Sequence, residues 1–190
     1  MVETADRTEE SIPDGGGTSN SAWQVLDFGV GAEEAARDFI GETLDLWGRG
    51  ELSTRVQVAV GELVANALGH GLPQGIRSAF PHPVVVSLVR EGPDVLVAVF
   101  DPGTQGPLLS TGQEGNGLRI VEAASDAWGW TVPGPYGKAV WAAFTAAGSG
   151  AGMAAAVGER LMLLVEVFTG SSEPRLVAAH PARFLSRFPT

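Results

Sequence analysis

The sequence predicts an α+β fold, a two-layer α/β sandwich in which helices cover one face of a mixed, mostly antiparallel sheet. Two pairs of apolar segments are each joined by a short turn rich in glycine and proline, which is typical of β-hairpins. Other segments carry apolar residues three and four positions apart, which is typical of helices that bury one side. Helices and hairpins follow one another in runs, and the lack of strict strand–helix alternation favours an antiparallel-rich sheet.

The N-terminal half is expected to contribute one strand and two helices. Residues 22–30 alternate loosely between apolar and polar, as an opening strand does, and residues 32–47 have apolar side chains near helical spacing. Ser53 has a side chain suited to an N-cap, so we expect a second helix from there to about Leu68, ended by the glycines that follow.

The remaining core elements are two hairpins with a short helix between them. The four strands are expected at 83–89 with 95–100 and at 127–132 with 139–144. A loop rich in glycine and proline at 101–116 leads into a helix from Leu118 to about Ser125.

The chain is expected to divide into three parts. Residues 1–20 are polar and acidic without apolar periodicity, which predicts a disordered tail, and residues 21–146 form the sandwich. Residues 147–190 are then a linker and an extension, with a possible strand at 159–168 and a short helix at 182–188. An accessory element, a dimer arm and a partner-binding piece are all open for this extension.

Composition excludes several classes of function. The net charge of -10 repels phosphate backbones, so nucleic acid is not an expected partner. The absence of cysteine removes disulfides, thiolate metal sites and a cysteine nucleophile, and it suits a reducing cytoplasm. No apolar run approaches the ~20 residues of a membrane span, and the polar N-terminus is unlike a secretory signal. We therefore expect a cytoplasmic protein that does not contact a membrane.

Glu62 and Asn66 are the first pair of candidate functional residues. They are four residues apart on the second predicted helix, so they share a face, beside the apolar stripe. An asparagine supplies a hard oxygen suited to Mg²⁺ that is held mainly by phosphates and water. A glutamate one turn earlier could accept a proton from an attacking hydroxyl. The alternative is a half-exposed polar pair, because this spacing is common on helices.

Asp101 ends a predicted buried strand and enters a loop of proline and glycine. A carboxylate in this position can accept a hydrogen bond from the amino group of adenine, which discriminates against bases that lack the donor. The alternative is an aspartate that only initiates a turn.

Gly115 and Gly117 flank Asn116 immediately before a predicted helix. Glycine lets a backbone approach a phosphate closely, and the unpaired N–H groups at a helix start favour an anion. The alternative is a flexible loop that ends in a helix cap.

Together these motifs resemble the ATP-binding domain of the GHKL (histidine kinase-like) type, especially that of actinobacterial anti-sigma-factor serine/threonine kinases. The resemblance covers residues 22–145 and rests on the ordered segments ELVANALGHG, DPG, EGNGLRIVEAASDAWGW and GKAVWAAF. It implies a Bergerat-type ATP-binding fold with ATP and Mg²⁺ as cofactors. The implied partners are a sigma factor and an anti-anti-sigma (STAS-type) protein, and a homodimer is a further implication.

The resemblance also implies roles for individual residues. Glu62 is the catalytic base, and Asn66 holds Mg²⁺ and thereby the nucleotide. Asp101 reads adenine, and Gly103 gives the backbone room beside it. The phosphate lid falls on four consecutive residues, Gly115, Asn116, Gly117 and Leu118.

Three further polar residues near the motifs are expected to be structural. Lys138 lies in a predicted hairpin turn and is expected to be solvated. Arg119 is expected to be exposed on its helix, with contact to a phosphate as the alternative, and His70 is expected to cap the second helix.

Two positions depart from the family pattern. Gln105 stands where a second glycine of the loop after Asp101 is expected, and Ala139 stands near the place where many members have threonine. Two functions therefore remain open. One is a kinase that binds a sigma factor and phosphorylates an anti-anti-sigma protein, and the other is a binding module with weak or lost nucleotide binding. A sensor histidine kinase is disfavoured, because no membrane segment and no room for a phosphoacceptor helical hairpin precede the first strand.

Overall fold

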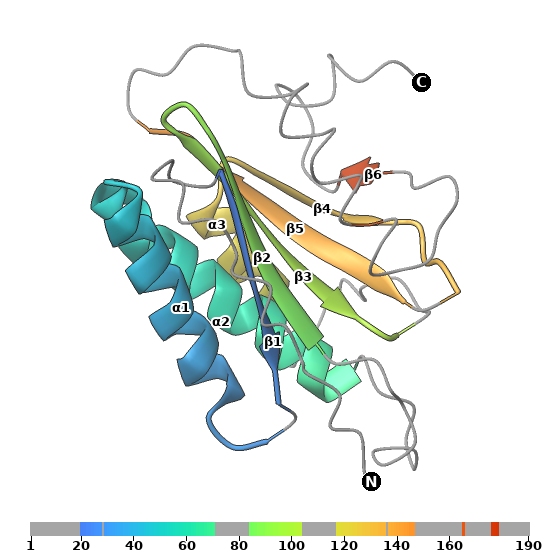
Figure 1. Ribbon diagram of the computed structural model, residues 1–190. Helices are drawn as coiled ribbons and strands as arrows, with labels where there is room; N and C mark the ends of the chain where they lie inside the picture. The colour runs from blue at the N-terminus through green and yellow to red at the C-terminus, as the bar shows by residue number, and fades with distance from the viewer. Residues whose placement is uncertain are drawn as a thin grey trace, which may run out of the picture.

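The structure is a computed structural model that describes residues 20–27, 29–70, 84–103, 117–135, 137–146, 165 and 176–178. The described residues form one sheet with the helices α1, α2 and α3 against one of its faces (Figure 1). The elements in chain order are β1 (Ser21–Leu26), α1 (Ala32–Leu46), the 3₁₀ helix η1 (Gly50–Leu52), α2 (Ser53–His70), β2 (Val84–Glu91), β3 (Asp94–Asp101), α3 (Gly117–Ala124), β4 (Ala127–Thr131), β5 (Lys138–Phe144) and β6 (Leu176–Ala178).

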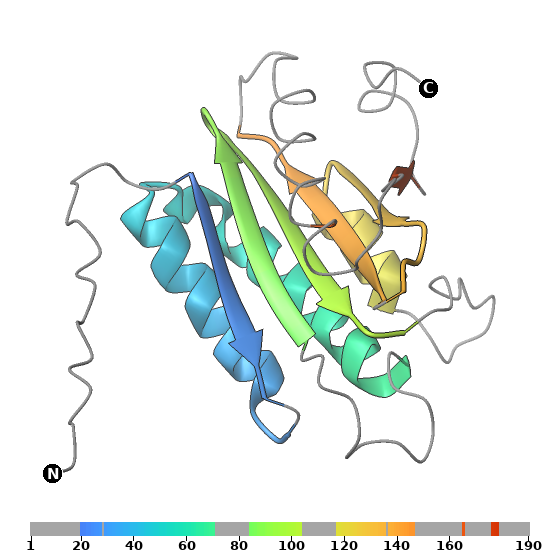
Figure 2. The ribbon, with the colours of Figure 1, turned by 45° about the vertical axis from the view of Figure 1, so that its right-hand side comes forward.

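The strands lie in the order β1-β2-β3-β5-β4-β6. Every neighbouring pair is antiparallel, so the sheet is antiparallel throughout its described strands. The predicted α+β sandwich with helices on one face is confirmed, and α1 and α2 lie side by side against the sheet in both views (Figure 2). β6 had no counterpart among the predicted elements.

The turn between β2 and β3 explains the register of the central strands. Glu91 pairs with Asp94, which leaves Gly92 and Pro93 as a two-residue loop. Gly92 has a φ of 56°, and a positive φ at the first loop position suits the hairpin turns whose twist matches that of the strands. The strands therefore run to the turn itself, beyond their predicted ends.

Ser53 is not the N-cap of α2, and that prediction is wrong. The N–H of Leu52 donates to the carbonyl of Arg49 at 2.9 Å, so a 3₁₀ turn has already closed before Ser53. Ser53 itself has right-handed helical angles, φ -52° and ψ -50°, whereas an N-cap residue is usually extended. The buried side chain of Leu52 holds this early turn against the core.

The main core lies between the helices and the sheet. Alternate residues of the central strands face it, and each buried aliphatic side chain contributes roughly 1.5–3 kcal/mol relative to exposure. Its members include Ala36, Ile40 and Leu44 from α1, Val56, Val60, Leu63 and Val64 from α2, and Val86, Leu88, Val97, Val99, Val140 and Phe144 from the sheet. Among the described residues no helix is both long and apolar enough to cross a bilayer.

The opposite face of the sheet carries a second buried cluster. This explains why β2, β3 and β5 are apolar along almost their whole length, with no alternation between apolar and polar residues. The second cluster consists of Val85, Val89, Leu96, Ala98, Phe100, Ala127, Ala139, Trp141, Ala143 and Val165.

Val165 is helical, which contradicts, at this residue, the strand predicted at 159–168. The rest of 159–168, the helix at 182–188 and the tail at 1–19 lie outside the described residues.

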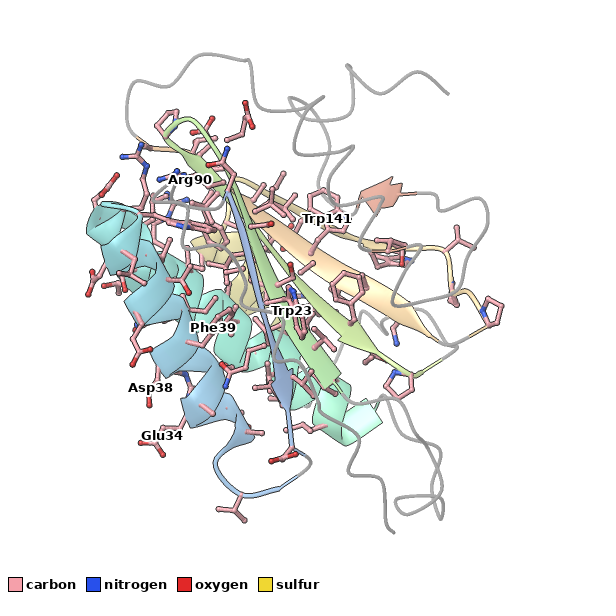
Figure 3. The ribbon with its side chains drawn as sticks, in the orientation of Figure 1. Trp23, Glu34, Asp38, Phe39, Arg90 and Trp141 are labelled. Carbon is pink, nitrogen blue, oxygen red and sulfur yellow. The ribbon has the colours of Figure 1, made fainter. Side chains whose placement is uncertain are left out.

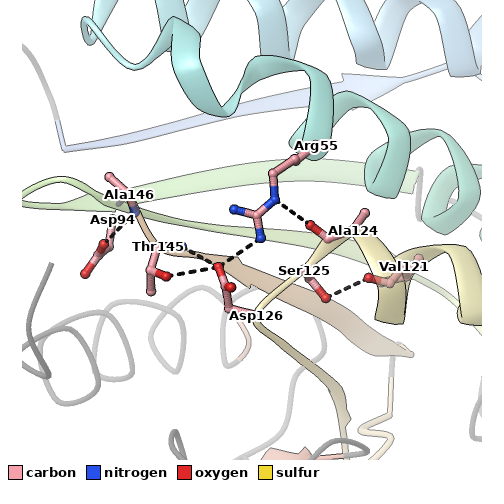
Figure 4. Close-up of polar contacts among 8 residues, drawn as sticks. All are labelled: Arg55, Asp94, Val121, Ala124, Ser125, Asp126, Thr145 and Ala146. Carbon is pink, nitrogen blue, oxygen red and sulfur yellow. Dashed lines mark hydrogen bonds and ion pairs between the residues drawn. The ribbon is translucent and has the colours of Figure 1, made fainter. Parts of the chain in front are cut away.

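A polar network joins the start of α2 to the ends of α3 and β5 (Figure 4). Arg55 donates through Nε to the carbonyl of Ala124 at 2.9 Å and through Nη2 to Asp126 Oδ2 at 3.0 Å. The same carboxylate oxygen accepts from the N–H and the hydroxyl of Thr145, at 2.7 and 3.1 Å. The guanidinium also lies 5.6 Å from the ring centre of Phe144. The carboxylate of Asp126, just after α3, thus links the start of α2 to the end of β5.

We expect Asp126→Ala to lower the free energy of unfolding by about 1–2 kcal/mol, because three donors lose their acceptor at a half-exposed site. Urea titration followed by circular dichroism measures the change. Asp38→Ala, on the exposed side of α1, is the matched control and should cause no loss (Figure 3). Equal stability of the two variants would show that the network does not stabilise the fold.

Candidate functional site

Glu62 and Asn66 lie half-buried on α2, against the first residue of α3. A Cβ atom at Gly117 would lie 2.8 Å from Glu62 Oε2 and 3.3 Å from Asn66 Nδ2. Real Cβ atoms essentially never approach a neighbour as closely as the first distance. A side chain at residue 117 would displace the flexible end of Glu62, so glycine lets the start of α3 lie close to this polar pair without moving it.

The amide of Asn66 has an unsatisfied donor. Its Nδ2 atom is buried and has no hydrogen-bond partner within the described parts of the chain. A buried donor without a partner costs about 1–3 kcal/mol, and such exceptions in folded proteins call for an explanation such as a ligand. An unpaired amide beside a carboxylate and a glycine cradle is the arrangement that a polar ligand would complete.

The polar atoms of Glu62 and Asn66, at the corner where α2 meets the start of α3, fit a magnesium ion that is held only partly by protein. Among the described residues, no three histidine, aspartate or glutamate side chains gather to form a metal site. Mg²⁺ often takes one or two protein oxygens and completes its octahedron with phosphates and water. Asn66 Oδ1 would be such an oxygen if a metal bound here, and Glu62 lies one turn away.

The first turn of α3 offers backbone N–H groups rather than side chains. Leu118 is buried in the main core, so only its backbone faces away from the sandwich interior. The N–H groups of a first helical turn lack intrahelical partners and favour an anion. Arg119 is exposed, as predicted, and Gly115 and Asn116 lie outside the described residues.

Asp101 and Lys138 form a buried ion pair at the end of the sheet. They are opposite one another in the β3–β5 ladder, and Lys138 Nζ lies 2.8 Å from Asp101 Oδ1. Their side chains are only 3% and 7% exposed. The prediction that Lys138 is solvated is wrong, because the register places it inside the sheet, directly across from a carboxylate.

Gly103 completes the surroundings of this carboxylate. Its N–H donates to the same oxygen, Asp101 Oδ1, at 2.8 Å, and its carbonyl accepts from Lys138 Nζ at 3.3 Å. Burial raises the pKa of Asp101 above its ordinary value of 3.8, while the charge of Lys138 and both hydrogen bonds oppose the rise. Both of these donors bind Oδ1, and neither binds Oδ2.

Gly137 lets β5 begin close to β3. It has a φ of 127°, and a Cβ atom there would collide with the backbone of Asp101 and Pro102, so a glycine is required at this position.

Ala139 belongs to the second cluster, on the face of the sheet away from Asp101. The family departure at Ala139 is therefore on the opposite side of the strand from the carboxylate, and Gln105 lies outside the described residues.

No family model and no curated protein matches this chain. Its structure is similar to the crystal structure of the RsbU and RsbW domains of Rv1364c from Mycobacterium tuberculosis, with a TM-score of 0.50 and 21% sequence identity. The similarity covers 67% of this chain and 32% of that chain, so this chain spans about a third of the other's length. At this identity the likeness supports the fold alone.

We expect Lys138→Met to lower the free energy of unfolding at pH 7 by about 3–5 kcal/mol, because it leaves a buried carboxylate without its cation. The pKa of Asp101 should then rise further above 3.8. The loss of stability should shrink as the pH falls through this raised pKa, because the carboxyl takes up a proton and loses its charge. Denaturant titrations from about pH 8 down to about pH 4 measure the loss and its pH dependence.

The double variant Asp101→Asn/Lys138→Met is the control for this prediction. It keeps an oxygen acceptor for the N–H of Gly103 and removes both charges, so it should recover most of the lost stability. A double variant as unstable as Lys138→Met would show that the ion pair is not the source of the loss.

Proposed function

We propose that this chain is an anti-sigma-factor-like serine/threonine protein kinase. It binds Mg-ATP at the corner of α2, α3 and the ends of β3 and β5, binds a sigma factor, and phosphorylates a hydroxyl of an anti-anti-sigma partner. The observation that carries the proposal is the contact of Gly117 with Glu62 and Asn66, whose buried amide has no partner among the described residues. The order of the motifs and the likeness in fold to the RsbU and RsbW domains of Rv1364c support the same class of protein.

Each part of the nucleotide has a group suited to it in this corner. Asn66 Oδ1 would hold Mg²⁺, the N–H groups of the first turn of α3 would hold phosphate oxygens, and Asp101 Oδ2 would accept from the amino group of adenine. When bound, ATP supplies the phosphoryl group and Mg²⁺ neutralises its charge, so positioning and electrostatics provide most of the catalysis.

Glu62 is the proton acceptor in this proposal. Its Oε2 atom lies beside the glycine that begins α3, one helical turn from Asn66. A hydroxyl that enters between α2 and α3 would meet this carboxylate near the metal ligand. Because Glu62 is only half-buried, its carboxylate is within reach of an entering hydroxyl and would accept the proton as the hydroxyl attacks.

Nucleotide binding is tested by the melting temperature in the presence of Mg-ATP and Mg-ADP. At about 100-fold excess over Kd, the ligand should add about 2.7 kcal/mol to the free energy of unfolding. Asn66→Ala should remove the shift because it takes the amide away, and Gly117→Ala should reduce it because the methyl group displaces the end of Glu62. Glu34→Ala, on the exposed side of α1, should keep it (Figure 3). The absence of a shift for the unaltered protein at millimolar nucleotide would refute the ATP site.

Phosphate transfer is tested with Glu62→Gln and a co-expressed anti-anti-sigma partner. The rate of transfer should fall by about 10²–10⁴-fold, because the amide cannot accept the proton. The melting shift with Mg-ATP should remain, since the variant keeps the size and polarity of the side chain. Transfer at the original rate would show that Glu62 is not the base.

A second candidate function is a binding module without nucleotide. The observation that favours it is the Asp101–Lys138 pair, whose carboxylate is 3% exposed and already engaged by two donors. In that case the chain would bind a sigma factor or another regulator while nucleotide produces no melting shift. The same titration therefore separates the two functions.

A further inference from the structure

The face of the sheet that points away from the helices is almost entirely apolar. Nine residues of the second cluster come from β2, β3, β4 and β5. On β2, the polar Ser87 lies on this face between the two cluster members Val85 and Val89. Trp141 is 0% exposed and Phe100 is 3% exposed, although a two-layer sandwich leaves this face without a helix from the described α1, α2 or α3. Contiguous apolar patches of more than a few hundred Å² are rare on the surfaces of monomeric proteins. Something therefore covers this face.

Val165 identifies the segment that provides the cover. It is 0% exposed and is the one member of the second cluster that does not belong to the sheet among the described residues. It comes from the extension 147–190, outside the predicted sandwich. The sequence at 161–168, LMLLVEVF, is apolar at every position except Glu166. A single valine is too small to cover a tryptophan and a phenylalanine, so its apolar neighbours in the sequence are the natural source of the remaining area.

The extension also reaches an edge of the same sheet. β6 pairs antiparallel with β4, with Ala178 opposite Gly129 and Leu176 opposite Thr131 (Figure 2). Addition of a strand satisfies the backbone N–H and carbonyl groups that an edge strand otherwise presents to other chains. The extension therefore contacts the sheet at two places, a face and an edge, separated by ten residues of chain.

We propose that residues 147–190 dock on the second face of the sheet as an intramolecular partner, anchored by Val165 on the face and by β6 on the edge of β4. The docked segment occupies the surface over β3, β5 and β4, and it keeps this surface from other protein chains. The surface continues past the cover onto β1, where Trp23 and Val25 are 57% and 45% exposed (Figure 3). The sheet face is thus a protein-binding surface whose occupant belongs to the same chain.

The absence of native cysteine allows a direct test of the cover. Ala142→Cys and Ala143→Cys place a thiol on adjacent residues of β5, of which Ala142 belongs to the main core and Ala143 to the second cluster. In the otherwise unaltered full chain, both thiols should react slowly with a maleimide. When Val165→Asp is added, the thiol at position 143 should react at least about tenfold faster, while the thiol at 142 should stay protected. Val132→Asp, at a residue that is 44% exposed, is the matched control and should change neither rate.

Three outcomes would overturn the proposal. The first is protection of position 143 in the Val165→Asp background, and the second is equal exposure of positions 142 and 143, which would make Val165 part of a single cooperative core. The third is a rate at position 143 that rises on dilution of the chain without a Val165 substitution, which would assign the cover to a second copy. If Val165→Asp does not fold, as judged by circular dichroism, Val165→Ser is used in its place with the same expected difference between the two thiols.

Discussion

The pairing of β3 with β5 places Val95 opposite Phe144 at one end and Asp101 opposite Lys138 at the other. A slip of one residue in this ladder would turn every side chain of a strand to the other face of the sheet. The main core, the second cluster and the buried ion pair all depend on this one register. Gly137 makes the register possible at its tightest point, because any side chain there would collide with the backbone of Asp101 and Pro102.

The candidate site costs stability in two ways. The amide of Asn66 has a buried donor without a partner among the described residues, and burial raises the pKa of Asp101 despite the cation beside it. Neither arrangement improves packing, since a hydrocarbon side chain of similar volume avoids both penalties. Polar groups that cost stability at the meeting point of several elements are typical of sites built for a ligand. Here the unsatisfied amide of Asn66 lies on α2, whereas the carboxylate of Asp101, whose Oδ1 already accepts two hydrogen bonds, lies at the end of β3.

The sequence was sufficient for the features that depend on local patterns. Apolar periodicity located the helices and both hairpins, and a spacing of four placed Glu62 and Asn66 on one face of α2. The features that it did not predict arise from contacts between distant segments. Ser53 has the side chain of a cap, but the earlier turn at Leu52 is held by burial against the core. Lys138 has the surroundings of a solvated turn residue until the β3–β5 register is known, and β6 pairs with a strand more than forty residues earlier in the chain.

Arg55 Nε donates to the carbonyl of Ala124, so one hydrogen bond ties the last residue of α3 to α2. The first turn of the same helix is held by Leu118 in the main core, beside the close approach of Gly117 to Glu62 and Asn66. A helix of eight residues is about 12 Å long, so these two attachments lie within one short rigid rod. A substitution that shifts α3 as a whole would therefore alter the bond at Ala124 and the approach of Gly117 together.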